Sequence, residues 1–468
     1  MSAPERLKSP LMRKDGKFVE VAWSEAYQFL AAKLKEVGEN IGGIGGARSS
    51  NEDNFLFQKL FRETLKSGNL DSRLNRYQGA ASEPLFERFG HHGMGNSIEQ
   101  LEAMKTVFAL GADLQDEQPI IFLRIRKVWR FKNAKVIYAN DHRVEDTTNL
   151  GDFALANLIY RSGTEVALLN GILNSLFSQK LAGATEGLDF SALQSYVAEW
   201  TPERTAKETG VSLEEIESTA RMISIGSTAF IVGKTVTEHP LYLDIVSALG
   251  NLLTVTGNSA NLNIPGDSVN SQGAADMGLL PDFAPGYWPY APKGMHTDAM
   301  LEAASNGKLK ALWIHEADLL EEHHNPDLAK SALENCSFIV VNDLFLTETA
   351  KHADLVLPVS SVAEKDGTFT SCERRVQRFY KAFELDPNIK PAWLVFSEMA
   401  TQLGSKSTYF SSRDILKEIA ASVPAYSDIT PKSLGESGIR WSYPEGEMTP
   451  PTIVLSAKAP PAIKVEAK

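Results

Sequence analysis

The chain has 468 residues, a formal net charge of −12 and a 43% share of hydrophobic residues. This length is too great for one hydrophobic core, so two or three domains are expected. The acidic balance argues against nucleic acid as a partner, because phosphate binding needs a basic face. No apolar run approaches the roughly 20 residues that cross a bilayer, and the polar N-terminus shows no secretory signal.

The chain has two cysteines, Cys336 and Cys372, which do not form a Cys-x-x-Cys pair. Two thiolates cannot hold a cubane iron–sulfur cluster or build a cysteine-rich zinc site. Any electron relay is therefore expected on another polypeptide or on a bound organic cofactor. Cys372 has no base nearby in the sequence, which favours a packed, unreactive thiol.

In chain order, the first expected element is a hairpin, because Asp15-Gly16 lies beside an alternating apolar run. Ser24 is expected to cap the helix that follows. The glycine-rich run 41–46 then predicts the end of a strand, and Ser49 with Glu52 predicts a capping box for a helix to residue 65. This βα unit is typical of an open α/β sheet, but it lacks the third glycine of a dinucleotide fingerprint and the ending of a phosphate loop.

Short β-rich runs alternate with helical stretches along the rest of the chain, which indicates parallel, doubly wound sheets. The predicted strands are 107–111, 135–140, 229–233, 309–315, 338–342 and 353–358. The proline-rich stretch 444–468 predicts a flexible tail or an arm laid on a partner.

Several histidines and basic residues have competing interpretations. His323-His324 could form a metal patch, but the turn at Asn325-Pro326 favours a solvated loop face. His91-His92 could touch a ligand, although loop packing is favoured. Surface or subunit contact is expected for the basic residues after Pro119, which are Arg124, Arg126, Lys127 and Arg130.

Three segments together resemble the molybdopterin oxidoreductases, such as formate dehydrogenases. The first runs from Arg48 to Asn54 and on to Gly68-Asn69-Leu70-Asp71. The second is Thr256-Gly257-Asn258 with Asn270-Ser271-Gln272-Gly273-Ala274-Ala275-Asp276-Met277-Gly278, which lies beside the pterin in active members of the family. The third runs from Thr349 to Gln377 and contains Glu364-Lys365-Asp366-Gly367-Thr368-Phe369-Thr370.

The chain departs from this family at the positions that carry its chemistry. The resemblance places a cysteine or selenocysteine metal ligand at Tyr77 and a catalytic histidine at Gln78. A phenol is a poor substitute for a soft thiolate, and an amide cannot act as a base near neutral pH. Catalytic residues and a bound metal are therefore not expected in this chain.

Two loops also differ from the family's Gly-x-Asn-Pro pattern, namely 111–114 and 315–318. At the second loop His315 replaces glycine, so we expect its side chain to block the approach of a cofactor. Carboxylates such as Glu316 would also repel phosphates. A vestigial pocket without cofactor is therefore expected from Gly111, Asp113, Gly257, Asn270, Gln272, Gly273, His315, Glu316, Gly367 and Thr368. Arg374-Arg375 would then pair with carboxylates within the domain or across an interface.

The resemblance implies two intertwined, doubly wound α/β domains with mainly parallel sheets and without the family's C-terminal β-barrel. The expected division is a hairpin and helix over 1–37, one domain over 38–74 and 236–405, an inserted domain over 75–235, a helical extension over 406–443 and the tail over 444–468.

Among relatives, the large peripheral-arm subunit of complex I-type NADH:quinone oxidoreductase fits these departures best. Gly111 to Pro119 with Arg124-Ile125-Arg126, and the ending from Val423 to Trp441, are similar to that subunit. The resemblance implies a non-catalytic scaffold on the cytoplasmic side of the inner membrane. Its partners would be peripheral-arm subunits that carry iron–sulfur clusters and FMN. The alternative is an active, formate dehydrogenase-like enzyme that binds molybdopterin and uses an oxygen ligand such as Ser82 or Asp71.

Overall fold

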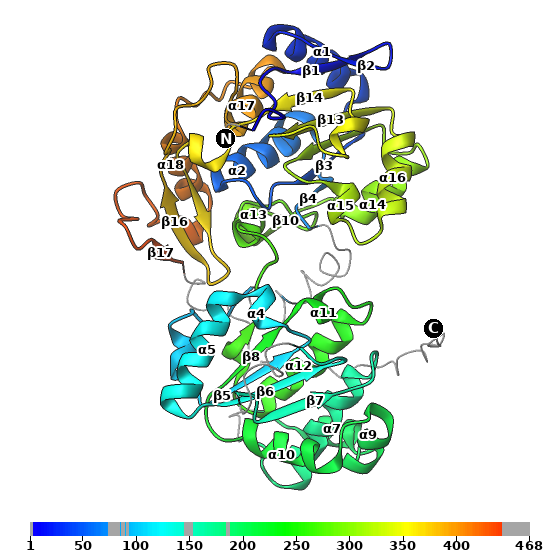
Figure 1. The fold of residues 1–468 in the computed structure, drawn as a ribbon, viewed down its shortest axis with the longest axis vertical. Coiled ribbons are helices and arrows are strands. Elements are labelled where there is room, and N and C mark those ends of the chain that lie inside the picture. Colours follow the sequence, from blue (N-terminus) through cyan, green and yellow to red (C-terminus); the bar gives the residue numbers. More distant parts are fainter. Residues whose placement is uncertain are drawn as a thin grey trace. The chain divides into compact units, whose positions relative to one another are not determined.

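A computed structural model describes residues 3–73, 85, 89, 93–144, 153–183 and 188–441. The chain divides into two compact units (Figure 1). Unit 1 contains the described residues up to 73 and from 268 onward, and unit 2 contains those from 85 to 267. The chain returns to unit 1 at Ser268, so the expected return at 236 is too early. The expected tail over 444–468 lies outside the described residues.

Unit 1 is built on a seven-stranded sheet with the order β2-β1-β14-β13-β12-β3-β4. Neighbouring strands from β14 to β4 are parallel, whereas the hairpin of β1 and β2 adds two antiparallel strands. The expected separate segment 1–37 is therefore part of this sheet. The strands are β1 (Leu11–Lys14), β2 (Lys17–Glu20), β3 (Ile41–Gly45), β4 (Leu70–Asp71), β12 (Ala311–His315), β13 (Phe338–Asp343) and β14 (Leu355–Pro358).

Helices cover both faces of this sheet. The helices α14 (Thr297–Ser305) and α16 (Pro326–Asn335) share one hydrophobic cluster with alternate residues of the strands, including Leu312 and Ile314. On the opposite face, Trp313 packs edge-on against Phe57 of α2 (Asn51–Lys59) and Phe396 of α17 (Ala392–Gln402). Alternation along β12 therefore decides which helix layer each side chain meets.

The remaining elements of unit 1 surround these layers. They are α1 (Trp23–Val37), η1 (Leu60–Leu65), α13 (Ser271–Asp276), β10 (Phe283–Ala284), η5 (Pro285–Tyr287), β11 (Trp288–Pro289), α15 (Leu319–Glu322), η6 (Ala350–His352), η7 (Val362–Glu364), α18 (Ser412–Ser422) and η8 (Pro424–Tyr426). A separate antiparallel sheet joins β15 (Gly367–Thr370), β16 (Arg375–Phe379) and β17 (Ile439–Arg440).

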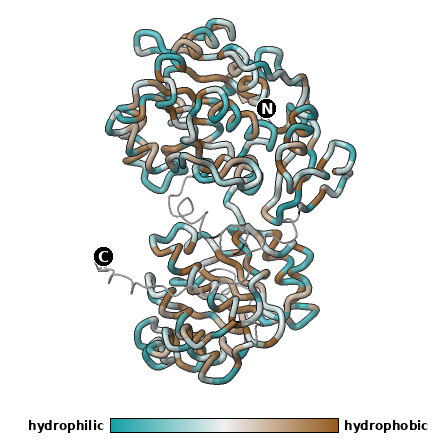
Figure 2. Tube along the Cα trace, turned by 180° about the vertical axis from the view of Figure 1, so that it is seen from behind, coloured by the Kyte–Doolittle hydropathy of each residue, from teal (hydrophilic) through white to brown (hydrophobic). Residues whose placement is uncertain are grey.

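Unit 2 has a five-stranded parallel sheet with the order β7-β6-β5-β8-β9. Its strands are β5 (Thr106–Leu110), β6 (Lys135–Asn140), β7 (Ala156–Ile159), β8 (Thr228–Val232) and β9 (Leu262–Asn263). Its helices are η2 (Gln100–Ala103), α4 (Leu114–Glu117), α5 (Pro119–Lys132), α7 (Glu165–Ser178), α8 (Ser191–Val197), α9 (Pro202–Thr209), α10 (Leu213–Ile223), α11 (Lys234–Thr237), α12 (Tyr242–Val255) and η4 (Ser259–Asn261). In Figure 2 the hydrophobic colouring follows the inner strands and helices of each unit.

Two predicted helix caps are wrong in detail. Ala22 precedes α1 and makes no side-chain cap, so Ser24 is not the capping residue. The capping box of α2 is formed by Ser50 and Asp53, one residue later than predicted. The shift leaves the carboxyl group of Glu52 available for other contacts. In the part of the chain that the structure describes, no helix is both long and apolar enough to cross a membrane.

Candidate functional site

Two loops of the same sequence pattern follow a central strand, one in each unit. Both read Ala-Asp-Leu-x-x-Glu, and they contain Asp113 with Glu117 and Asp318 with Glu322. The backbone angles agree closely, with φ −107° and ψ 87° at Asp113 and φ −105° and ψ 93° at Asp318. In each loop the glutamate accepts a hydrogen bond from the backbone N–H of the aspartate, at 2.9 Å and 3.1 Å. In each loop a glutamate of the chain itself therefore occupies a backbone N–H group that is otherwise suited to bind an external anion.

In unit 2 the carboxyl edge of the sheet carries enclosed polar atoms. Oδ1 of Asp113 and Oδ1 of Asn140 are buried and have no hydrogen-bond partner among the described residues. Gly111 adopts a positive φ of 61°, which only glycine accommodates easily. Glu117 also accepts from the backbone N–H of Lys234 at 2.9 Å, and burial raises its pKa. This edge is where open parallel sheets bind their ligands.

Gly257 does not join this edge. It follows α12 and precedes β9, so it lies at the amino edge of the same sheet, opposite Gly111. Its positive φ of 69° ends α12, and the neighbouring Asn258 accepts a hydrogen bond from the N–H of Thr228 at the start of β8. The structure therefore brings Gly111 and Asp113 together but places Gly257 apart.

In unit 1 the imidazole of His315 points into the core. It packs between Phe57 and Phe396, with ring centroids 5.4 Å and 5.0 Å away, and it is completely buried. Its Nε2 lies 2.9 Å from Oγ of Ser49, which also donates to Glu316. Burial lowers the pKa of His315, so the imidazole is neutral. The expectation that this side chain blocks the loop is therefore wrong.

The family-like motifs meet in a buried polar network of unit 1. The amide of Asn51 donates to Oγ1 of Thr368 at 3.1 Å and to Oγ1 of Thr370 at 3.0 Å. Asn270 donates to Oδ1 of Asn51 at 3.0 Å and accepts from the N–H of Thr370 at 2.7 Å. These contacts join three segments that are far apart in the sequence. The would-be Cβ of Gly273 lies only 2.0 Å from Oδ1 of Asn51, so a glycine is required there.

Asp276 forms a second centre of this network. Its two carboxylate oxygens accept from the hydroxyls of Tyr287 and Tyr426, both at 2.6 Å, from Gln272 at 2.8 Å and from the indole of Trp441 at 2.9 Å. Burial raises the pKa of Asp276, although these four donors oppose the shift. The network of Asn51 and Asp276 is continuous, because Tyr426 also contacts Oγ1 of Thr370 at 2.7 Å.

Glu52 is the titratable group of this network that is best suited to proton exchange. Its carboxyl is buried and accepts from the N–H of Thr368 at 2.9 Å and from its hydroxyl at 3.0 Å. Gly367 allows this approach, because its would-be Cβ lies 3.1 Å from Oε2 of Glu52. Burial raises the pKa of Glu52 from 4.5 to about 7. A group with this pKa gives and takes protons readily at neutral pH.

The sequence missed several members of the network. Tyr287, Tyr426 and Trp441 lie outside the three motifs that carry the resemblance, and Glu52 was assigned only a capping role. Tyr426 and Trp441 lie near the C-terminal end of the described chain, far from Asp276 in the sequence. Only the tertiary fold brings them into contact with Asp276. The local signal for Glu52 was the presence of two overlapping Ser-x-x-acid patterns, of which only one can cap α2.

Other candidate residues have varied positions. Tyr77, Gln78, Ser82, His91 and His92 lie outside the described residues. The carboxylate of Asp71 is already engaged, because Oδ1 accepts from Arg73 and Oδ2 accepts from the N–H of Thr297 at 3.1 Å. Asp71 is therefore poorly placed to serve as a metal ligand.

The remaining arginines and cysteine behave much as their sequence context suggests. Arg375 pairs with Glu373 at 2.7 Å, whereas Arg374 lies over the ring of Trp441. Burial raises the pKa of the Cys372 thiol to about 11, so little thiolate forms at neutral pH. In unit 2, Arg124 and Lys127 both bind Glu102 on the surface.

The two mainly parallel sheets with polar carboxyl edges define an α/β protein of the class that binds ligands at these edges. Residues 6–402 match the family described as molybdopterin oxidoreductase, and the chain belongs to that family. A solved structure of acetylene hydratase from Pelobacter acetylenicus shares this fold with a TM-score of 0.74. It is 18% identical, and the match covers 89% of this chain and 64% of that one.

Formate dehydrogenases are among the relatives in sequence. The formate dehydrogenase subunit alpha of Methanocaldococcus jannaschii is 34% identical, over 93% of this chain and 68% of its own length. Formate dehydrogenase H of Escherichia coli is 30% identical, over 93% of this chain and 66% of its own length. The chain thus spans about two thirds of these relatives. These findings overturn two expectations, a non-catalytic subunit of complex I and a chain without a pterin cofactor.

The described residues fit a polar, pterin-type cofactor. Two buried atoms at the carboxyl edge of the unit 2 sheet, Oδ1 of Asp113 and Oδ1 of Asn140, have no hydrogen-bond partner in the described part of the chain. A buried polar atom costs free energy until it is hydrogen-bonded, so these atoms favour a bound polar group. The two carboxylates Glu117 and Glu322 oppose a phosphate at the adjacent N–H groups.

Proposed function

We propose that this chain is the molybdopterin-binding subunit of a formate dehydrogenase-like oxidoreductase. The proposal is supported by relatives that are named as formate dehydrogenases and that match most of this chain. The buried carboxyl of Glu52, which accepts two hydrogen bonds from Thr368 within the network that joins the motifs, is the observation that carries it. Oxidation of formate gives carbon dioxide, two electrons and a proton, so the site needs a group that exchanges a proton near neutral pH.

The residues of this chain have two roles in the proposal. Asp113 and Asn140 in unit 2 would hold polar groups of the cofactor. When bound, the pterin with its metal supplies the two-electron acceptor. Glu52 would take up the proton released from formate, and the hydroxyl of Thr368 is hydrogen-bonded to its carboxyl group. Tyr77 stands at the expected thiolate position, so the metal would carry an oxygen ligand instead.

Electrons must also leave the site. The relative from Methanocaldococcus jannaschii is named as a subunit alpha, which supports a partner subunit for this chain as well. The residues present include two cysteines, too few for a cubane cluster. We therefore place any iron–sulfur electron carrier outside these 468 residues.

The test is formate-dependent reduction of a viologen dye by the full chain loaded with molybdopterin. Glu52→Gln should lower the rate by about 100-fold and remove the pH dependence near 7, because the amide cannot accept the proton. Glu384→Gln is the matched control, since the side chain of Glu384 is 88% exposed and pairs with Lys381 on the surface. A folded, pterin-loaded chain that reduces no dye with formate would contradict the proposal.

A further inference from the structure

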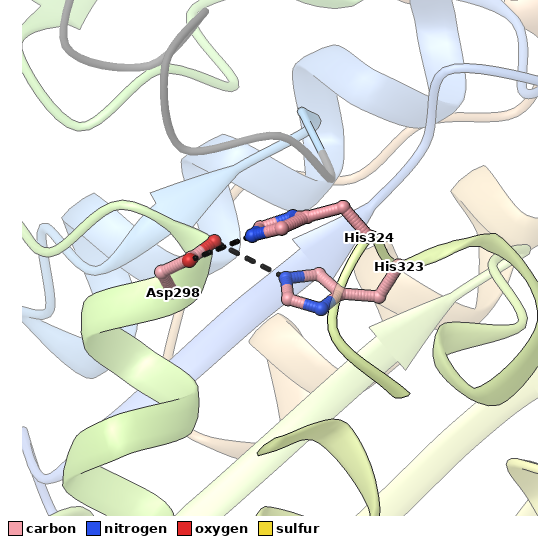
Figure 3. Close-up of side chains that lie close together, drawn as sticks. All are labelled: Asp298, His323 and His324. Carbon is pink, nitrogen blue, oxygen red and sulfur yellow. Dashed lines mark hydrogen bonds and ion pairs between the residues drawn. The ribbon is translucent and has the colours of Figure 1, made fainter. Parts of the chain in front are cut away.

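Unit 1 contains a cluster of metal-ligating side chains outside the network described above. Asp298 is the second residue of α14, and His323 and His324 follow α15 (Figure 3). Nε2 of His323 lies 3.1 Å from Oδ1 of Asp298, and Nε2 of His324 lies 3.3 Å from Oδ2. The three ligand atoms all lie within 4.8 Å of one another. Both imidazoles therefore converge on one carboxylate.

The positions of these residues are fixed by packing. The helices α14 and α16 contribute Leu301 and Leu333 to the same hydrophobic cluster on the sheet. The side chains of Asp298 and His323 are 3% and 0% exposed, whereas that of His324 is 30% exposed. The expected solvated loop face is therefore wrong for His323. A cluster held this rigidly needs little reorganisation to bind an ion.

The donor set and its spacing suit a first-row divalent ion. Two imidazole nitrogens with one carboxylate oxygen are a common ligand set for Zn²⁺. Bonds of about 2.0–2.1 Å in tetrahedral geometry place neighbouring ligand atoms about 3.3 Å apart. The separations of 3.1 Å and 3.3 Å join the two imidazoles to different oxygens of Asp298, and the three ligand atoms lie within 4.8 Å of one another, so a small side-chain adjustment brings them to that spacing. The partly exposed His324 leaves a side from which the ion and a water molecule can enter.

The surroundings of His323 can also supply the second hydrogen bond of a metal-bound imidazole. Its Nδ1 lies 3.1 Å from the backbone carbonyl oxygen of Asn325, as well as 3.2 Å from the N–H of the same residue. Metal-bound histidines usually donate their second ring N–H to a backbone carbonyl or carboxylate, which fixes the ring and the tautomer. The carbonyl of Asn325 can accept that hydrogen bond once Nε2 is bound to an ion.

We propose that Asp298, His323 and His324 bind one Zn²⁺ ion, with the fourth position taken by water. The ion joins the start of α14 to the segment between α15 and α16. This site is separate from the pterin chemistry, so it stands or falls independently of the proposed function.

The test uses the full chain, stripped with a chelator and titrated with Co²⁺ and then with Zn²⁺. We expect one Co²⁺ per chain with the visible absorption of a tetrahedral site, displaced by one Zn²⁺. Zinc is counted separately from molybdenum by elemental analysis. His324→Gln and Asp298→Asn should each weaken binding by at least about tenfold.

His142→Gln provides the matched control. His142 and Asp141 also form a histidine–carboxylate pair, at 2.6 Å, but the pair lies on the surface of unit 2. Its substitution should leave zinc binding unchanged. Because Asp298 is buried, its variant could unfold, and the more exposed His324 then decides the question. Absence of stoichiometric binding, or unchanged affinity in folded His324→Gln, would overturn the proposal and leave a purely structural hydrogen-bonded group.

Discussion

Asp53 and Lys365 form an ion pair inside unit 1, with 0% and 5% of their side chains exposed. The carboxylate also accepts from Oγ of Ser50 at 2.7 Å and from the N–H of Trp393 at 2.8 Å. Burial alone would raise the pKa of Asp53, but the ammonium group of Lys365 outweighs this effect and holds it low. The pair thus links the starts of α2 and α17 to the loop before β15, next to the network of Glu52.

Removing one partner of this pair should be strongly destabilising. Lys365→Met leaves the carboxylate of Asp53 buried without its cation, so we expect unit 1 to lose about 3–5 kcal/mol of unfolding free energy. The double variant Asp53→Asn with Lys365→Met should recover part of that loss. Urea denaturation measures both.

The control for this prediction is Lys381→Met, because Lys381 pairs with Glu384 on the surface. Surface pairs contribute little, so its effect should stay within about 1 kcal/mol. If Lys365→Met were as mild as this control, the buried pair would not stabilise the fold.

Most of the parallel strands could be predicted from the sequence because they are buried on both faces and therefore form short, continuous apolar runs. The strands β5, β6, β8, β12, β13 and β14 overlap the predicted ranges. The short strands β4 and β9 and the sheet of β15–β17 could not be predicted in this way. Their residues alternate with polar ones or number only two, and their pairing depends on segments distant in the sequence.

Part of the candidate site was predictable in its residues, but its contacts were not. The motifs named Asn270, Gln272 and Thr368, and the structure brings them into one network. The choice of Ser50 rather than Ser49 as the cap of α2 could not be predicted, because both fit the local pattern. Distant partners decide it: Ser49 contacts His315, and Glu52 accepts from Thr368.

The raised pKa of Glu52 predicts how stability depends on pH. Its folded pKa of about 7 lies above the ordinary value of 4.5. The folded state therefore binds this proton more tightly, and the associated stability is present below pH 4.5 and lost as the pH rises through 7. The loss amounts to about 3 kcal/mol across this window.

Glu52→Gln should remove that part of the pH dependence, so the variant gains stability relative to the wild type between pH 5 and pH 8. Burial also raises the pKa of Asp343 to about 7, and this residue contributes the same pH dependence of stability to both proteins. Melting temperatures at the two pH values measure the difference. Parallel pH curves for the two proteins would show that Glu52 does not titrate in this range.

Gly273→Ala should disrupt the polar network. The new Cβ would lie 2.0 Å from Oδ1 of Asn51 and 2.2 Å from Oδ1 of Asn270, so both side chains must move. We expect a loss of about 2–3 kcal/mol, because the displaced buried amides lose hydrogen bonds. Gly257→Ala is the control: nothing lies within 4 Å there, and only its positive φ of 69° opposes the substitution. Its cost should be about 1 kcal/mol. Equal losses would show that the contacts of Gly273 are unimportant.

The carboxylates of the two similar loops give the last prediction. Glu117 occupies the N–H groups of Asp113 and Lys234, and Glu322 occupies that of Asp318. Glu117→Gln keeps an acceptor for these N–H groups but removes the negative charge, so a nearby phosphate is repelled less. We expect the purified variant to retain more molybdopterin than the wild type, measured by the fluorescence of the oxidised pterin.

Glu322→Gln should act in the same direction. In the neighbouring Glu321 the backbone N–H, and not the side chain, bonds to Asp318, so Glu321→Gln should have a smaller effect. If all three variants retained equal amounts, the capping carboxylates would not control occupancy of the site, and the polar atoms of Asp113 and Asn140 would be left as its determinants.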